Sequence, residues 1–216
     1  LKYQPWLNLV EVFEGDATNP TAVSASLKSV DVAYYLLHAL MAKTDFELKE
    51  AELASIFASA AKSQKVKRII YLGGIASADS ELSPHLKSRA DTGEILRNSG
   101  VPTIELRAGV VIGSGSASFE MLRYLTERLP FMITPKWLNV RIQPIAVRDV
   151  LRYLVGAAAI DQKISGHFDI GGPDIFSYKE MMQRYAEAAG LRKRIIIPVP
   201  VMTPKLSSGW VGLVTP

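Results

Sequence analysis

The sequence predicts an α/β protein with a doubly wound, Rossmann-like parallel sheet. Three observations predict this class. Short apolar runs rich in β-branched residues alternate with longer amphipathic stretches along most of the chain. The apolar runs are continuous rather than interrupted at every second residue, which is typical of strands buried on both faces. The stretches between them also have the length that crossover helices need to connect parallel strands.

The first half of the chain contains three predicted strands, at 9–13, 31–37 and 66–72. Asn19–Pro20 provides an N-cap and a first-turn proline for the helix after the first strand. A capping box at Thr44 and Glu47 begins the helix after the second strand. The helix after the third strand begins at Ser83–Pro84 and stops at Gly100.

The second half continues the alternation. We predict strands at 101–106, 167–170 and 195–199, an extended segment at 141–147, and helices at 118–128 and 149–159. A further helix begins with the capping box Ser177-x-x-Glu180 and ends at Gly190. No internal repeat interrupts this order.

Composition favours one compact domain or slightly more. Of the 216 residues, 48% are hydrophobic and 21% charged, and a chain of this size can bury about 70% of its unfolded surface. No apolar run reaches the roughly 18 residues of a membrane span, since the best run, 32–42, contains His38. We therefore expect no membrane partner. The absence of cysteine excludes disulfides and thiolate metal sites and agrees with a cytoplasmic location.

The net charge is +4, from 25 Lys and Arg against 21 Asp and Glu. The positive residues are scattered, and their densest groups are 65–68 and 192–194. A nucleic-acid-binding face would concentrate them. The charge pattern therefore predicts no nucleic-acid partner, and it leaves a small-molecule substrate and a homo-oligomer open.

Five phrases follow one another in the order of a known family. They are Gly15-Asp16, Tyr71-Leu72-Gly73-Gly74, the segment 107–113 (RAGVVIG), the segment 143–150 (QPIAVRDV), and the segment 168–180 (FDIGGPDIFSYKE). Together they resemble the extended and atypical short-chain dehydrogenase/reductases, in particular the NmrA-like NAD(P)-binding group of nucleoside-diphosphate-sugar epimerases. The resemblance covers nearly the whole chain. It implies a partial Rossmann-like domain at 1–112, a substrate-side lobe interleaved with the sheet at 113–200, and a linker-like tail at 201–216.

The resemblance implies NAD or NADP as the cofactor. The implied contacts are Asp16 with the adenine, Gly73, Gly74, Ala108, Gly109 and Val110 under the nicotinamide, and Leu37 and His38 lining the same crevice. Doubly wound sheets bind ligands at the carboxyl ends of their strands, where these residues lie. Two alternatives stay open: Asp16 could simply cap the following turn, and His38 could be hydrogen-bonded within the fold.

One departure from the family pattern concerns the diphosphate. The family opens with a strand and a turn of the form G-x-x-G-x-x-G, whose glycines let the backbone approach the diphosphate at a helix N-terminus. No such turn precedes Leu9. We therefore expect the first βαβ unit to lie upstream of Leu1, which leaves the sheet incomplete at its N-terminal end, and we expect the 216 residues alone to bind a dinucleotide poorly.

A second departure concerns catalysis, because His85-x-x-x-Arg89 stands where the family has Tyr-x-x-x-Lys. Residues four apart share one helix face. A histidine, with its ordinary pKa of about 6.5, can exchange a proton at neutral pH, and an arginine can orient a carboxylate or phosphate. The alternative is two ordinary polar residues at an exposed helix N-terminus. No group of residues has metal-ligand spacing, so we expect no metal site.

These observations support two functions. The first is an NAD(P)-dependent oxidoreductase or epimerase-like enzyme with an unknown substrate. The second is a non-catalytic NAD(P)-binding module with a regulatory or structural role, which the loss of Tyr-x-x-x-Lys would suit.

Overall fold

The computed structural model describes residues 5–37, 46–75 and 84–199. The chain forms two compact units: unit 1 comprises residues 1–107 and 154–168, and unit 2 comprises residues 108–153 and 169–216. His38, Thr44, Ser83 and the predicted tail at 201–216 lie outside the described residues. None of the helices in the described part of the chain has both the length and the apolar character needed to cross a membrane.

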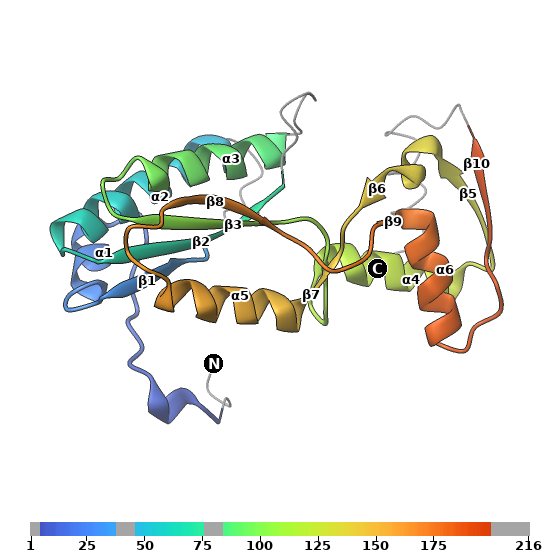
Figure 1. The fold of residues 1–216 in the computed structure, drawn as a ribbon, viewed down its shortest axis with the longest axis horizontal. Coiled ribbons are helices and arrows are strands. Elements are labelled where there is room, and N and C mark those ends of the chain that lie inside the picture. The colour runs from blue at the N-terminus through green and yellow to red at the C-terminus, as the bar shows by residue number, and fades with distance from the viewer. Residues whose placement is uncertain (1–4, 38–45, 76–83, 200–216) are drawn as a thin grey trace. The chain divides into compact units, whose positions relative to one another are not determined.

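Unit 1 is built on a four-stranded parallel sheet in the order β1-β2-β3-β8 (Figure 1). Its strands are β1 (Val32–Tyr35), β2 (Arg68–Gly74), β3 (Thr103–Ala108) and β8 (Gly166–Ile170). β1 and β2 pair in parallel, with Tyr35 opposite Tyr71. The predicted α/β class with a Rossmann-like parallel sheet is therefore confirmed.

Helices cover both faces of this sheet, as Figure 1 shows, with α2 and α3 on one face and α5 on the other. The helices are α1 (Pro20–Ser26), α2 (Phe46–Ser63), α3 (Pro84–Arg97) and α5 (Val147–Ala159). Asn19 caps α1 as predicted, because its side-chain oxygen accepts hydrogen bonds from the backbone N–H groups of Thr21 and Ala22 at 3.0 and 3.3 Å. Apolar side chains on α2 and α3 then pack on the sheet.

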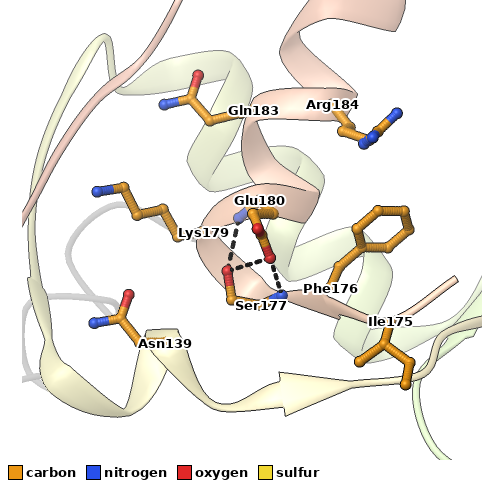
Figure 2. Close-up of a pocket in the computed structure, with 8 residues that line it drawn as sticks. All are labelled: Asn139, Ile175, Phe176, Ser177, Lys179, Glu180, Gln183 and Arg184. Carbon is orange, nitrogen blue, oxygen red and sulfur yellow. Dashed lines mark hydrogen bonds between the residues drawn. The ribbon is translucent and has the colours of Figure 1, made fainter.

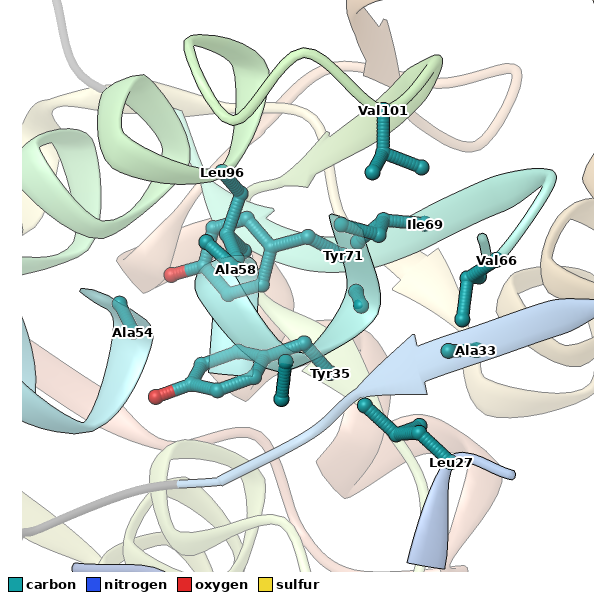
Figure 3. Packing of buried hydrophobic residues seen from close by; sticks show 12 residues of the cluster. Leu27, Ala33, Tyr35, Ala54, Ala58, Val66, Ile69, Tyr71, Leu96 and Val101 are labelled. Atoms are coloured by element: carbon teal, nitrogen blue, oxygen red, sulfur yellow. The ribbon is translucent and has the colours of Figure 1, made fainter. Parts of the chain in front are cut away.

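Two tyrosines lie at the centre of the core between the sheet and these helices (Figure 3). The Tyr35 ring contacts Phe57 edge to face at a centroid distance of 5.0 Å, and it contacts Tyr71 at 5.9 Å. Ile69 and Leu96 are fully buried beside them. The core therefore joins β1 and β2 to α2 and α3 through large, closely packed side chains.

The predicted strand at 9–13 is wrong. A 3-10 turn, η1 (Leu7–Leu9), is followed by residues 11–16 without regular structure, and the apolar side chains of the segment are exposed. A β-branched run favours extended backbone, but a strand also needs a partner for its hydrogen bonds. Within the described ranges no strand pairs with this segment, and β1 is the last strand on its side of the sheet.

Unit 2 contains α4 (Ala117–Arg128), α6 (Tyr178–Ala188), the first half of α5 and several short strands. The remaining elements are β4 (Val111–Ile112), β5 (Phe131–Pro135), η2 (Lys136–Asn139), β6 (Arg141–Ile142), β7 (Ile145–Ala146), β9 (Phe176–Ser177) and β10 (Ile195–Val199). β5 pairs with β10 and β4 with β7 in parallel, while β6 and β9 pair antiparallel. The strand at 195–199 is confirmed, but its partner β5 was not predicted.

Candidate functional site

The carboxyl ends of β1 and β2 lie at the same edge of the sheet in unit 1. Because Tyr35 is opposite Tyr71, Leu37 and Gly73 each follow that pair by two residues. The exposed apolar side chains at this edge are Leu36, Leu37 and Ile75. Doubly wound sheets bind their ligands outside the carboxyl ends of the strands.

Gly73 and Gly74 end β2, and internal packing explains why Gly73 lacks a side chain. A Cβ on Gly73 would lie 2.9 Å from Oε1 of Glu105, whereas a Cβ on Gly74 would lie 3.4 Å from Nε of Arg89, an ordinary contact distance. Gly73 is buried and Gly74 half-buried. Gly73 therefore leaves room for the Glu105 side chain, and the predicted approach of a nicotinamide to both glycines stays a prediction.

The predicted pair on α3 lies in the first two turns of that helix. Nη2 of Arg89 donates a hydrogen bond to the carbonyl oxygen of Leu72 at 2.5 Å. Its guanidinium is therefore fixed at the end of β2, beside Gly74. His85 lies one turn earlier, and both side chains are half-buried. The structure thus brings Arg89 to the strand end, while the catalytic role of both residues stays a prediction.

Tyr71 does not take the place of the family's tyrosine. Its side chain is only 4% exposed, and its hydroxyl donates a hydrogen bond to the backbone carbonyl of Arg89 at 3.2 Å. Burial raises the pKa of Tyr71 above its ordinary value. The phenol is therefore neutral at pH 7 and holds α3 on the sheet instead of facing a ligand.

Asp16 caps the turn before α1, which is the alternative role considered above. Its Oδ1 accepts hydrogen bonds from the backbone N–H and the hydroxyl of Thr18, both at 2.8 Å. These hydrogen bonds lower the pKa of Asp16, and the charge of Lys49 on α2 lowers it further. Asp16 is therefore within electrostatic reach of the first turn of α2. The adenine contact stays a prediction.

The remaining predicted cofactor residues that the structure describes belong to unit 2. Ala108 and Val110 are buried and Gly109 is exposed. The carbonyl oxygen of Val110 accepts a hydrogen bond from the backbone N–H of Ile145 at 2.9 Å. Ala108 therefore ends β3 and Val110 lies beside the pair of β4 and β7, and their place in one site with Gly73 and Gly74 stays a prediction.

A separate pocket of about 610 Å³ lies in unit 2 (Figure 2). Its lining residues are Asn139, Ile175, Phe176, Ser177, Lys179, Glu180, Gln183 and Arg184. The Arg184 guanidinium lies over the Phe176 ring at 5.0 Å. The sequence predicts the capping box but gives no sign of the pocket, because the lining comes from three elements that share no periodic pattern. The lining carries two cations, one carboxylate and two amides, so it suits a polar group.

The predicted capping box of α6 is confirmed at the edge of this pocket. Ser177 Oγ accepts a hydrogen bond from the backbone N–H of Glu180 at 3.2 Å, and the backbone N–H of Ser177 donates to Oε2 of Glu180 at 2.6 Å. The hydrogen bonds from Ser177 hold the pKa of Glu180 below its ordinary value, and the charges of Arg141 and Arg184 lower it further. The carboxylate is therefore ionised at neutral pH.

This shift predicts a pH dependence of stability. A carboxyl with a lowered folded-state pKa stabilises the protein above its unfolded-state pKa, and that stability is lost as the pH falls through the folded value. The free energy of unfolding, from urea titrations between about pH 5 and pH 3, should therefore fall less steeply in Glu180→Gln than in the wild type. Glu187→Gln, an exposed change near the other end of α6, is the control. Parallel curves for wild type and Glu180→Gln would contradict the prediction.

No group of His, Asp and Glu side chains in the described ranges could hold a metal ion. The chain combines a unit built on a Rossmann-like parallel sheet with a second unit of short strands and helices. This combination is an α/β fold with a Rossmann-like parallel sheet.

Solved structures share this fold. A nucleoside-diphosphate-sugar epimerase from Staphylococcus aureus is 18% identical, with a TM-score of 0.75 over 97% of this chain and 71% of that one. The Bordetella bronchiseptica enzyme WbmG, solved with NAD and UDP, is 18% identical, with a TM-score of 0.68 over 94% and 74%. The dTDP-4-dehydrorhamnose reductase of Bacillus anthracis, solved with NADP, is 14% identical, with a TM-score of 0.66 over 86% and 72%.

At these identities the likeness shows the fold. No family model and no curated protein sequence matches the chain.

Proposed function

We propose that this chain binds NAD or NADP at the carboxyl edge of β1 and β2 and acts as an oxidoreductase or epimerase-like enzyme of the atypical short-chain dehydrogenase/reductase group. The observation that carries the proposal is a fold shared over most of the chain with enzymes solved with NAD and NADP. A nucleotide sugar is the substrate class that the neighbours' names suggest.

The residues at this edge fit the rings of a dinucleotide. Leu36, Leu37 and Ile75 offer exposed apolar surface, and Asp16 is an anion that can accept hydrogen bonds from an adenosine. The diphosphate has no matching element, because no G-x-x-G-x-x-G occurs in the sequence. We therefore expect the 216 residues to bind the dinucleotide weakly, through its adenine and nicotinamide ends.

A bound nicotinamide would supply a hydride donor or acceptor. In the proposal His85 exchanges the proton that accompanies hydride transfer, because an imidazole can act as a general acid or base. Arg89, held by the Leu72 carbonyl, gives a fixed positive charge that can orient a carboxylate or phosphate. An enzyme of this kind lacks the Tyr and Lys dyad, so we expect weak activity on simple alcohols and ketones.

Saturation-transfer NMR with NAD⁺ and NADH on the 216-residue chain tests the binding. We expect transfer to the adenine and nicotinamide protons. Asp16→Asn keeps an acceptor for Thr18 but loses the charge, so it should weaken binding about tenfold or more, the value of one charge-assisted hydrogen bond. Asp31→Asn is the matched control, since Asp31 pairs with Lys67 at the amino end of β1. No transfer to either ring, or equal weakening by both variants, would overturn the site.

The second candidate is a non-catalytic NAD(P)-binding module. The observation that favours it is the replacement of the dyad by His85 and Arg89, together with the engagement of the Arg89 guanidinium by a backbone carbonyl. Cofactor oxidation and reduction assays with nucleotide sugars separate the two functions. Turnover by the wild type that is lost in His85→Gln supports the enzyme. Cofactor binding without any turnover supports the non-catalytic module.

A further inference from the structure

Helix α3 carries the candidate pair, and polar contacts join it to three different neighbours. Ser88 Oγ donates a hydrogen bond to the Glu50 carboxylate on α2. Arg89 donates to the Leu72 carbonyl on β2. Arg97 forms an ion pair with Glu105 on β3. Ser88 and Glu105 are each only 2% exposed, so two of these contacts involve fully buried groups.

Contacts of this kind determine the register of a helix more strictly than apolar packing does. The hydrophobic effect has no preferred direction and tolerates small sliding movements. Hydrogen bonds and ion pairs need defined distances and angles, and those of charged groups are the most demanding. Together with the hydrogen bonds that the Tyr71 and Thr103 hydroxyls donate to carbonyl oxygens of α3, these contacts give the helix one position on the sheet.

Glu105 is the most tightly enclosed of these groups. Its carboxylate lies between β2 and α3, where a Cβ on Gly73 would be 2.9 Å from Oε1 and a Cβ on Gly93 would be 2.5 Å from the same atom. Only glycine at both positions leaves room for the carboxylate. The Arg97 side chain, 28% exposed, reaches in from the last turn of α3 to pair with it. A buried carboxylate is strongly destabilising without such a partner.

The same carboxylate is close to the candidate site. Gly73, which faces Glu105, is followed by Gly74, which faces Arg89. The pair of Arg97 and Glu105 therefore joins the C-terminal turn of α3 to the strand end at which the N-terminal turns carry His85 and Arg89. A shift of α3 along its axis would break this ion pair and would move Arg89 away from Leu72.

We propose that Arg97 and Glu105 are positioning residues: their ion pair, seated between Gly73 and Gly93, sets the register of α3 and so holds Arg89 and His85 at the carboxyl end of β2. The register is a property of unit 1 alone. Its effect on cofactor or substrate rests on the proposed function.

The double variant Arg97→Met/Glu105→Met separates positioning from mere stability. Replacing a buried ion pair by apolar side chains of similar volume is often neutral or stabilising, so we expect the melting temperature to stay within about 4 °C of wild type or to rise. The ¹H–¹⁵N signals of the Arg89 Nε–H and the His85 imidazole should nevertheless shift. The Arg123 Nε–H signal should keep its position, because this group donates to Glu120 on α4 of unit 2.

The matched control is Glu120→Met/Arg123→Met, which removes another ion pair, with an N–O distance of 2.8 Å, on α4 of unit 2. It should leave the Arg89 and His85 signals unchanged. Where the wild type turns over a substrate, the Arg97/Glu105 variant should lose up to about 100-fold in turnover, as small misplacements of catalytic groups do, with a smaller change in KM. The control should retain its turnover.

Unchanged Arg89 and His85 signals in a folded Arg97/Glu105 variant would overturn the proposal. Arg97→Lys keeps the charge but loses the planar fork of donors, and it serves if the double variant does not fold. It should move the same two signals by a smaller amount, and unmoved signals would again overturn the proposal. If the wild type binds no cofactor, the proposed function fails, and the NMR comparison still decides whether the ion pair sets the register.

Discussion

Replacing Arg68 with methionine should lower the free energy of unfolding by about 3 kcal/mol. The Arg68 side chain is 1% exposed and donates hydrogen bonds to the carbonyl oxygens of Asp161 at 2.7 Å and Ala157 at 3.3 Å. These carbonyls lie at the C-terminus of α5, where a positive charge is favourable. Methionine would fill part of the space but leave both acceptors without this donor. Urea titration followed by circular dichroism measures the loss.

The neighbouring residue provides the control. Lys67 forms an ion pair with Asp31 at 2.9 Å, and both side chains are more than half exposed. Exposed pairs contribute about 0–1 kcal/mol, so Lys67→Met should change stability little. Similar losses in Lys67→Met and Arg68→Met would contradict the role assigned to Arg68.

Unit 2 uses an arginine in the same way. The Arg194 side chain is 8% exposed, and its Nε donates a hydrogen bond to the carbonyl oxygen of Thr126 at 2.7 Å. Its Nη2 donates to the carbonyl oxygen of Glu127 at 3.3 Å, near the end of α4. In each unit, therefore, a buried arginine from the start of a strand satisfies the carbonyls near the C-terminus of a helix.

These two arginines show what the charge pattern could not predict. Both belong to the densest positive groups of the sequence, 65–68 and 192–194, and a sequence gives no sign of which member of such a group is buried. The partners are backbone carbonyls almost 100 residues away for Arg68 and almost 70 residues away for Arg194. Every residue has a backbone carbonyl, whatever its side chain. The sequence therefore contains no complementary charge that would identify the partner of either arginine.

Sequence patterns that involve only neighbouring residues predict the local structure correctly. The N-cap at Asn19–Pro20 and the capping box at Ser177 and Glu180 involve residues within four positions of one another, and both are confirmed. The segment 9–13 has an equally clear β pattern and is not a strand. The difference is that a cap is completed by its own neighbours, whereas a strand depends on another strand, which can come from any part of the chain.

The candidate site likewise contains local features that the sequence predicts and long-range contacts that it does not. The i, i+4 spacing predicted that His85 and Arg89 share a face of one helix, and both are half-buried in the first two turns of α3. Glu105, Arg97 and Gly93 were not identified. A glycine within a helix lowers helix propensity and carries no periodic signal, so its purpose becomes visible only when the carboxylate from β3 is seen to occupy the space beside it.

Gly93→Ala should lower the free energy of unfolding by about 3 kcal/mol. The new methyl group would lie 2.5–2.6 Å from three atoms of the Glu105 carboxyl group, which is buried and held by Arg97. Moving that carboxylate away from its partner costs about 3–5 kcal/mol, and the better helix propensity of alanine returns only about 1 kcal/mol.

The matched control is Gly156→Ala on α5, where a Cβ would meet no atom within 4 Å. This change should stabilise the protein by about 0.5–1 kcal/mol, since the helix gains alanine without any clash. A double-mutant cycle then tests the cause. In a Glu105→Ala background Gly93→Ala should no longer destabilise, because the added methyl group has no carboxylate to displace. If Gly93→Ala still lowers stability in the Glu105→Ala background, the added methyl group clashes with another neighbour of α3. That result would contradict the enclosure of Glu105 by the two glycines.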